Sequence, residues 1–242
     1  MGILNKTFLA LDNITDQELD QLEKRLEKYP TKDLYGLKIG LEAFYLHHFK
    51  IINLLSSNYN CKIFLDLKLH DIPQTVRKAI EALKNYPIDY LTIHLSGGEK
   101  MIQAAQEARD KAIPSAKILG VSYLTSLNEE DFLKNWGFSN TEQIRNAMTK
   151  LYSLVLKSKN PIDGIVLSAT ELDIINSLEK QLKTNQKILK VCPGLRFDLE
   201  DTQDQARVET PERAIKNGAD FLVMGRPLIS LFESNTPLPE SL

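Results

Sequence analysis

Eight short apolar segments recur along this chain, and each is followed by a longer stretch that mixes apolar and polar residues. The segments are rich in leucine and β-branched residues, which is typical of strands buried on both faces of a parallel sheet. We predict strands at residues 7–11, 35–39, 62–67, 90–94, 117–122, 164–167, 188–192 and 221–224. This alternation restricts the chain to folds in which helices cover a parallel sheet.

The longer stretches have the spacing of amphipathic helices. Apolar residues recur at helical intervals in two of them, at Leu19, Leu22 and Leu26 and at Ile80 and Leu83. We predict helix starts at two capping boxes and at one N-cap followed by proline, namely Thr15-x-x-Glu18, Ser96-x-x-Glu99 and Thr210-Pro211.

Eight strands that alternate with helices over 242 residues predict a single-domain (β/α)8 barrel, or TIM barrel, over residues 1–242. A doubly wound open sheet is the alternative, because local periodicity does not show whether a sheet closes on itself. Two connections, residues 126–139 and 197–209, are long and polar. Long loops of this kind are either lids and binding loops or inert surface insertions.

The charge and the cysteine content limit the classes of partner. A net charge of −2 gives no reason to expect nucleic acid or an anionic membrane as a partner, so an anionic ligand needs a local basic site. Cys61 and Cys192 match no disulfide or metal-ligand spacing, which favours a reducing compartment. Apolar runs stay well short of the roughly 20 residues that span a bilayer. The N-terminal residues lack the pattern of a signal peptide. We therefore predict a cytoplasmic globular protein.

The third predicted strand ends in a cluster of charge. Asp66 and Lys68 are two residues apart, so side-chain alternation points them the same way, and Asp71 follows where the chain turns into the next helix. Two carboxylates beside one lysine favour the charged ammonium. A solvated ion pair at the strand end is the plainer interpretation. For Asp71 the plainer interpretation is a helix cap, because Asp71-x-x-Gln74 has the pattern of a capping box.

The same segment carries a resemblance. Asp66-Leu67-Lys68-Leu69-His70-Asp71-Ile72-Pro73-Gln74-Thr75 resembles the pattern Asp-x-Lys-x-His-Asp-Ile-Pro-x-Thr of the orotidine 5'-phosphate decarboxylase family. Other segments resemble further landmarks of that family, in family order: Leu9-Ala10-Leu11-Asp12, Leu37-Lys38-Ile39-Gly40, His94-Leu95-Ser96-Gly97-Gly98, Leu124-Thr125-Ser126, Pro193-Gly194-Leu195-Arg196, Asp204-Gln205-Ala206-Arg207 and Gly225-Arg226-Pro227. The resemblance covers nearly the whole chain.

This resemblance implies an enzyme that removes the C6 carboxylate of orotidine 5'-monophosphate as CO2 and leaves uridine 5'-monophosphate, the last step of de novo UMP biosynthesis. Negative charge develops at C6, and a fixed ammonium beside that carbon stabilises it and supplies the proton. Lys68 is implied as this group, within an alternating network of Lys38, Asp66, Lys68 and Asp71. The family needs no cofactor, so we expect neither a cofactor nor a metal.

The resemblance also implies how the substrate is bound. Asp12 is implied to bind the ribose, Lys38 belongs to the charged network, and Thr125 is implied to contact the pyrimidine. The phosphate end is implied at Arg196, Gln205, Gly225 and Arg226. An arginine fork and the N–H groups of a helix N-terminus suit a phosphate. In the family, the residues that match Asp71 and Thr75 reach the active site of a partner subunit, which implies a homodimer with shared sites.

Two other functions compete with this one. Related sugar-phosphate enzymes, such as 3-keto-L-gulonate 6-phosphate decarboxylase and hexulose-phosphate synthase, share the Asp-x-Lys-x-x-Asp pattern but use Mg²⁺, partly through an acidic residue at the end of the second strand. Lys38 occupies that position here and would repel a divalent cation. A non-catalytic barrel that binds a nucleotide or a protein partner is the second alternative. Such a barrel does not require all four charged residues of the network.

Overall fold

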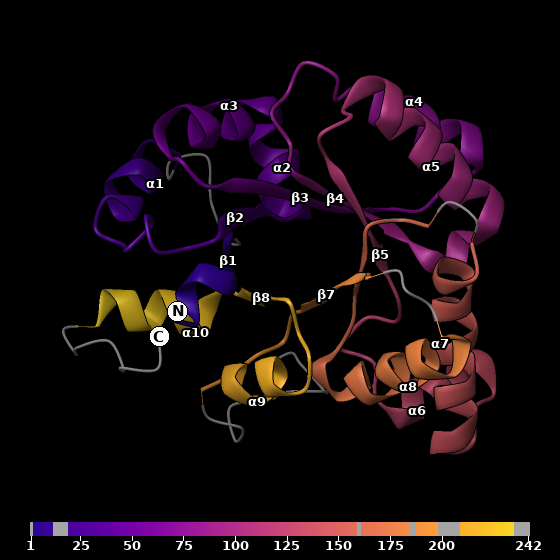
Figure 1. The fold of residues 1–242 in the computed structure, drawn as a ribbon. Helices are drawn as coiled ribbons and strands as arrows, with labels where there is room; N and C mark the ends of the chain where they lie inside the picture. Colours follow the sequence, from indigo (N-terminus) through magenta and orange to yellow (C-terminus); the bar gives the residue numbers. More distant parts are fainter. Residues whose placement is uncertain (1, 12–18, 159–160, 184–186, 198–208, 235–242) are drawn as a thin grey trace.

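The computed structural model describes residues 2–11, 19–158, 161–183, 187–197 and 209–234. Within that part of the chain, eight parallel strands pair in sequence order, and the last pairs with the first to close a barrel. Helices surround the ring of strands (Figure 1). The closed ring confirms the predicted (β/α)8 barrel and rules out the open doubly wound sheet.

The strands lie close to their predicted positions. They are β1 (Thr7–Leu11), β2 (Gly36–Ile39), β3 (Lys62–Leu69), β4 (Tyr90–His94), β5 (Lys117–Val121), β6 (Gly164–Val166), β7 (Leu189–Cys192) and β8 (Phe221–Met224). Three have the predicted bounds, and four differ by one residue at one end. The exception is β3, which continues two residues beyond its predicted end and so includes Lys68.

The α-helices are α1 (Leu19–Leu26), α2 (Leu41–His47), α3 (Phe49–Asn58), α4 (Pro73–Glu81), α5 (Gly98–Ala112), α6 (Glu129–Trp136), α7 (Thr141–Leu156), α8 (Leu172–Leu182), α9 (Pro211–Lys216) and α10 (Arg226–Glu233). Short 3-10 turns η1 (Leu4–Lys6), η3 (Leu95–Gly97) and η4 (Ala169–Glu171) accompany them. No helix in the described ranges is both long and apolar enough to cross a membrane.

The prediction of a long polar loop at residues 126–139 is wrong, because this segment contains helix α6. Asn128 caps the helix and accepts the Asp131 N–H, while the Asp131 carboxylate accepts the Asn128 N–H. This reciprocal capping box satisfies two N–H groups that a helix start otherwise leaves unpaired. Trp136 at the end of α6 packs on the rings of Tyr123 and Phe132, as expected for a packing residue.

The predicted helix starts have different outcomes. The N-cap at Thr210 is confirmed, since its hydroxyl accepts the Arg213 N–H and proline follows at the helix start. The capping box at Ser96 is wrong, because Ser96 lies in η3 and its hydroxyl bonds the rings of His70 and His94. Asp71 is also not a cap, since Ile72 occupies that position and α4 starts at Pro73. The box at Thr15-x-x-Glu18 lies outside the described residues.

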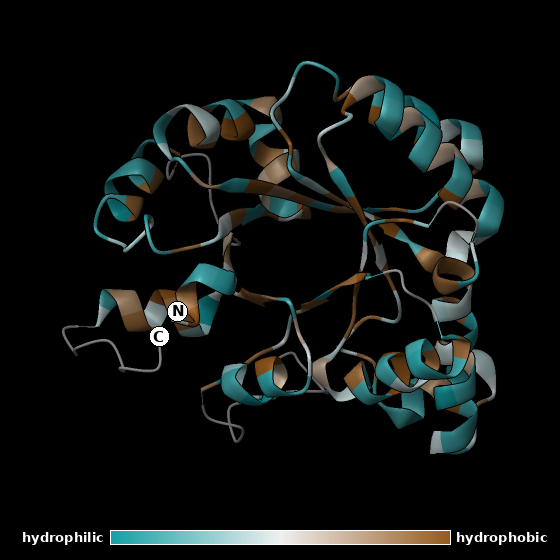
Figure 2. Cartoon of the chain, viewed as in Figure 1, coloured by the Kyte–Doolittle hydropathy of each residue, from teal (hydrophilic) through white to brown (hydrophobic). Residues whose placement is uncertain are grey.

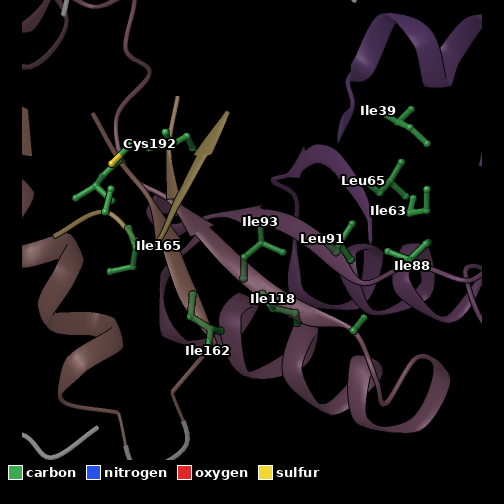
Figure 3. Packing of buried hydrophobic residues seen from close by; sticks show 14 of the residues in the cluster. Ile39, Ile63, Leu65, Ile88, Leu91, Ile93, Ile118, Ile162, Ile165 and Cys192 are labelled. Atoms are coloured by element: carbon green, nitrogen blue, oxygen red, sulfur yellow. The ribbon is translucent and has the colours of Figure 1, made fainter. Parts of the chain in front are cut away.

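The barrel has an inner and an outer apolar core. Inside the ring, Phe8 packs on Phe64 and Tyr90 with ring centroids 5.1 Å apart in each pair. Gly36 on β2 leaves room for this packing, because a Cβ there would lie 2.8 Å from the Phe8 ring. The larger outer core lies between strands and helices, and its apolar residues appear brown in Figure 2. Figure 3 shows part of it, including Ile39 and Leu65 from adjacent strands.

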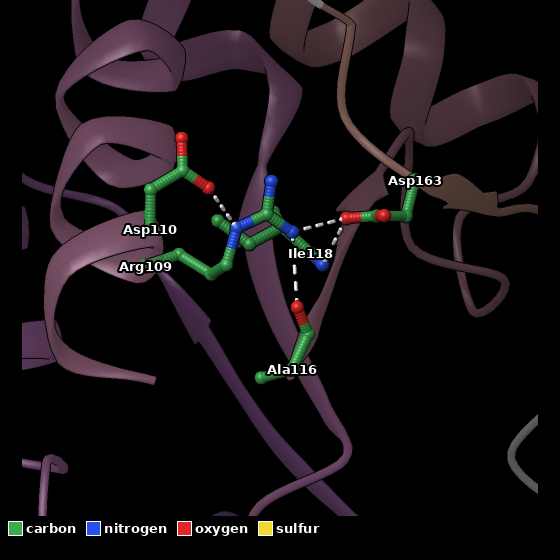
Figure 4. Close-up of polar contacts among 5 residues, drawn as sticks. All are labelled: Arg109, Asp110, Ala116, Ile118 and Asp163. Carbon is green, nitrogen blue, oxygen red and sulfur yellow. Dashed lines mark hydrogen bonds and ion pairs between the residues drawn. The ribbon is translucent and has the colours of Figure 1, made fainter. Parts of the chain in front are cut away.

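An aspartate directly before β4, β6 and β8 forms the same structure each time. Its carboxylate accepts the N–H of the second residue of the preceding strand, and its own N–H bonds the carbonyl of that residue. The three aspartates are Asp89, Asp163 and Asp220. Around Asp163, the Arg109 guanidinium adds an ion pair of 2.6 Å and also bonds the Ala116 carbonyl (Figure 4). These carboxylates hold the first residues of neighbouring strands together at the N-terminal end of the barrel.

We predict that Asp163→Ala lowers the free energy of unfolding by about 2 kcal/mol, because the Ile118 N–H and the Arg109 guanidinium both lose a charged acceptor. Urea unfolding followed by circular dichroism measures this change. Asp173→Ala removes an exposed ion pair with Arg145 and is the matched control, with an expected change within about 0.5 kcal/mol. Equal effects of the two substitutions would contradict a structural role for Asp163.

Candidate active site

A cavity of 400 Å³ opens at the C-terminal ends of the strands. Ala10, Phe64 and Val121 from the inner core also line it, so the packed barrel interior forms the base of the cavity. Seven of the residues predicted for the site lie in its wall: Lys38, Asp66, Lys68, Thr125, Arg196, Gly225 and Arg226. This end of the barrel is the one at which (β/α)8 barrels carry their active sites.

The other predicted residues lie elsewhere. Asp71 and Thr75 are exposed beside the start of α4 and do not line the cavity. The Asp71 carboxylate accepts the Ile72 N–H and does not join the lysine cluster within the described part of this chain. Asp12 and Gln205 lie outside the described residues. The structure therefore brings together three members of the predicted four-residue network.

Asp66 lies between two ammonium groups. Its Oδ2 is 2.7 Å from Lys68 Nζ and 3.7 Å from Lys38 Nζ. Asp66 and Lys38 are both buried. Burial by itself opposes ionisation of the carboxyl, but the two lysines and the hydrogen bonds from Lys68 and Thr92 outweigh it, so the pKa of Asp66 lies below its ordinary value. The carboxylate is thus charged, and it holds the Lys68 ammonium at the cavity wall.

Lys68 reaches this position through an irregular backbone. Between the pairs Leu65↔Leu91 and Leu69↔Ile93, three residues of β3 lie opposite the single residue Thr92 of β4. Lys68 adopts a φ of 48°, in the left-handed region that is unfavourable for a lysine. The prediction that Asp66 and Lys68 point the same way is right in outcome. A bulge, and not regular alternation, produces it.

Thr92 on β4 is a residue of this site that the sequence analysis missed. It is fully buried. Its Oγ1 accepts a hydrogen bond from the Lys68 N–H and donates one to Asp66 Oδ1, and each donor–acceptor distance is 2.8 Å. The available signal was a threonine that faces the barrel interior within an apolar strand, two residues before His94. Nothing in the local pattern shows which side chains it contacts, because they belong to another strand.

His94, at the end of β4, lies close to the lysine cluster. The Ser96 hydroxyl is 3.1 Å from His94 Nδ1 and 3.3 Å from His70 Nε2. Burial, the neighbouring His70 ring and the Lys68 ammonium together lower the pKa of His94. The neutral form of this imidazole is therefore favoured beside Lys68. Within the described residues, no group of three or more His, Cys, Asp or Glu side chains is placed to hold a metal ion.

Two arginines enter the cavity from the ends of β7 and β8. Arg196 is buried, and its N–H bonds the Glu209 carbonyl, so the two ends of the segment 197–209 are joined here. Arg226 starts α10, with Pro227 in the first turn. With Lys38 and Lys68 they give the described wall four basic side chains against the single acid Asp66. The cavity therefore favours an anion, although the whole chain is weakly acidic.

The segment after β5 forms another side of the cavity, where Tyr123, Leu124 and Ser126 accompany the predicted Thr125. The residue before this segment is hydrogen-bonded to Glu171, a buried residue that was not predicted from the sequence. Glu171 accepts hydrogen bonds from the hydroxyls of Ser122 and Tyr152. Ser122 directly precedes the lining residues, so these bonds fix the start of the segment.

Fold and cavity define the class: this is a (β/α)8-barrel protein whose cavity has a lysine–aspartate cluster on one side and two arginines on the other. A family model described as "Orotidine 5'-phosphate decarboxylase / HUMPS family" matches residues 5–231. The chain belongs to this family.

Relatives of known name agree with the family. Orotidine 5'-phosphate decarboxylase of Carboxydothermus hydrogenoformans is 38% identical over 93% of this chain and 89% of the relative. The protein of the same name from Listeria innocua is 36% identical over 97% and 95%. The crystal structure of orotidine 5'-phosphate decarboxylase from Lactobacillus acidophilus superposes with a TM-score of 0.71 at 27% identity, covering 94% of this chain and 96% of that chain.

We predict that the stabilising effect of Asp66 depends on pH. Because its pKa is lower in the folded state, the charged carboxylate stabilises the fold above its ordinary pKa of about 4, and this contribution is lost as pH falls through the lower folded-state pKa. Asp66→Asn takes up no proton. The gap in unfolding free energy between wild type and variant is therefore expected to be constant at neutral pH and to shrink below about pH 4. Urea unfolding across this range measures it, and a gap that does not shrink would contradict a charged Asp66.

Proposed function

We propose that this protein catalyses the decarboxylation of orotidine 5'-monophosphate to uridine 5'-monophosphate and CO2, the last step of de novo UMP biosynthesis. The observation that carries this proposal is the Lys38–Asp66–Lys68 cluster in a cavity whose other edge carries two arginines. Family membership and the names of the relatives support it.

The chemistry requires a fixed positive charge beside C6. As the bond from C6 to the carboxylate breaks, its electron pair stays on C6 and CO2 leaves. We assign Lys68 to stabilise this charge and then to transfer one proton to C6, which leaves a neutral amine that solvent reprotonates. The 2.7 Å contact with Asp66 supports the assignment, because a held ammonium needs no reorganisation as the charge develops.

Asp66 would have two effects in this mechanism. Its main one is to keep Lys68 charged and in place, together with Lys38 on its other side. It would also lie near the substrate carboxylate, so that like-charge repulsion is relieved as CO2 leaves. We assign neither effect to a cofactor or a metal ion.

We assign the phosphate to the edge formed by Arg196, Gly225 and Arg226. The arginine forks and the first N–H groups of α10 match the acceptors of a phosphate, and Gln205 would complete this edge. We assign Thr125 to the pyrimidine and, from the family resemblance, assign Asp12, which lies outside the described residues, to the ribose. Binding energy from the unreactive phosphate can serve to orient C6 against Lys68.

The name of the matching family extends beyond the decarboxylases, so membership alone does not choose the reaction. Lys38 favours the decarboxylase over the related Mg²⁺-dependent sugar-phosphate enzymes. Its ammonium lies 3.7 Å from Asp66, where a divalent cation bound to that carboxylate would be repelled. A barrel that only binds nucleotides is disfavoured, because simple binding does not need a buried aspartate between two lysines.

We predict that Lys68→Ala loses nearly all decarboxylation, because both the charge and the proton at C6 are removed. Arg226→Ala is the matched variant on the other edge, and we expect it to raise KM more than it lowers kcat. The change in ultraviolet absorbance of orotidine 5'-monophosphate measures both. Wild-type activity should persist in excess EDTA. Wild-type turnover in Lys68→Ala, or EDTA inhibition reversed by Mg²⁺, would refute the proposed mechanism.

We further propose a homodimer in the cytoplasm, with Asp71 and Thr75 completing the site of the partner subunit. The segment from His70 to Thr75 is exposed in this chain, and Ile72 within it is 66% exposed, which is unusual for an isoleucine in a single chain. Burial against a second copy accounts for this exposure. It also accounts for the exclusion of Asp71 from the cavity of its own chain.

Mixing two inactive variants tests the shared site. After subunit exchange between Lys68→Ala and Asp71→Ala, each mixed dimer would hold one intact site and one doubly altered site. Random pairing then restores roughly a quarter of wild-type activity. Mixing Lys68→Ala with Asp66→Asn is the control, because both residues belong to one chain and no activity should return. Absence of recovery in the first mixture, with subunit exchange verified, would exclude shared sites.

A further inference from the structure

Thr92 connects Asp66 and Lys68 of β3 without touching the cavity. It is fully buried on β4, behind the wall that Asp66 and Lys68 form. Its hydroxyl lies 2.8 Å from the Lys68 backbone nitrogen and 2.8 Å from Asp66 Oδ1. One atom thus bonds the backbone of one residue of the site and the side chain of another.

The direction of these bonds is determined by the chemistry of the groups. A backbone N–H can only donate, so the hydroxyl accepts from Lys68. A hydroxyl has one proton, so its single donated hydrogen bond goes to the charged carboxylate of Asp66. The second carboxylate oxygen, Oδ2, remains directed at the Lys68 and Lys38 ammonium groups. The two oxygens of Asp66 therefore have separate partners, which fixes the plane of the carboxylate.

The Lys68 bond compensates for the bulge. In a regular parallel ladder, a backbone carbonyl of the next strand would accept this N–H. Here three β3 residues lie opposite Thr92 alone, and a side-chain hydroxyl is the acceptor. Lys68 keeps its left-handed φ of 48° because the surrounding structure holds it there.

We propose that Thr92 is a positioning residue of the decarboxylation site, whose hydroxyl holds both the left-handed backbone of Lys68 and the carboxylate of Asp66 in the geometry that the reaction requires. This inference rests on the proposed function for its effect on turnover. Its structural content, the coupling of Thr92 to Asp66 and Lys68, is independent of the substrate.

The charged groups around Asp66 are few, so its titration reports on Thr92. In the described part of the chain, Lys38 faces it from β2 and Lys68 from β3. His94 on β4 and His70 after β3 lie on the Lys68 side. Replacing Thr92 by valine removes none of these charged groups and takes away a hydrogen bond that favours the charged carboxylate.

The test compares Thr92→Val, which removes the hydroxyl at nearly constant volume, with Thr92→Ser, which keeps it. For Thr92→Val we expect kcat to fall about 100-fold with little change in KM, because Lys68 is displaced while the phosphate edge is intact. The acid limb of the rate profile and the Asp66 titration, followed by carboxyl carbon NMR, should both move to higher pH. Thr92→Ser should restore all three. If Thr92→Val does not fold, Thr92→Ala takes its place.

Thr7→Val is the matched control. Thr7 is a fully buried strand threonine at the other end of the barrel. Its hydroxyl donates a hydrogen bond of 2.9 Å to the Ile3 carbonyl. It should lose stability but keep kcat and the Asp66 titration. Wild-type kcat and an unmoved titration in the Thr92 variants would overturn the proposal. An inactive wild type would instead overturn the proposed function, while the titration and a crystal structure of Thr92→Val would still decide the positioning role.

Discussion

The ionised carboxylate of Asp66, buried between two lysines, is the interaction on which the site depends. Lys38 and Lys68 repel each other, and burial adds a cost for the charge of Lys38, so the acid between them stabilises both ammonium groups. The carboxylate faces the same cost and needs both lysines. Removing Asp66 therefore leaves two neighbouring positive charges, and removing either lysine takes one of two ammonium partners from the buried carboxylate. The three residues act as one unit in folding as well as in the proposed reaction.

This unit requires a departure from regular backbone. The bulge in β3 and the left-handed Lys68 bring the ammonium back to the carboxylate two residues before it, and the Thr92 hydroxyl accepts the Lys68 N–H in place of a ladder carbonyl. Strain of this kind persists where neighbouring contacts determine the backbone. At the other end of the barrel, Asp89, Asp163 and Asp220 close regular hydrogen-bonded rings at strand starts. Regular, strongly paired backbone and the irregular backbone of the candidate site thus occupy opposite ends of one sheet.

Whether a feature of this structure could be predicted from the sequence depends on how far apart in the chain its interacting residues lie. Strand positions were predictable, because apolar runs and helical stripes are local patterns. The barrel was predicted from the number of alternating strands and helices, since no local pattern shows that the sheet closes. The N-cap at Thr210 was predictable because it too depends on local residues. The capping box at Ser96 failed because its hydroxyl bonds His94, two residues before it, and His70, which directly follows β3. Helix α6 was missed because its residues are polar and its cap is an asparagine paired with an aspartate. Thr92 was missed because its hydrogen-bond partners lie at least 24 residues away in the chain. Glu171 was missed because its partners lie at least 19 residues away.

The distribution of charge around the cavity indicates the class of ligand better than the net charge of the whole chain does. A chain of net charge −2 places four basic side chains and one acid around a single described cavity. Asp66 offsets one of the two lysine charges, so more of the formal positive charge of this wall lies on the side of Arg196 and Arg226, across the cavity. An anionic substrate with one group at each end would be oriented by this asymmetry before any specific contact forms. The fixed lysine cluster would then meet the reacting carbon, because the phosphate has already determined which end of the substrate enters.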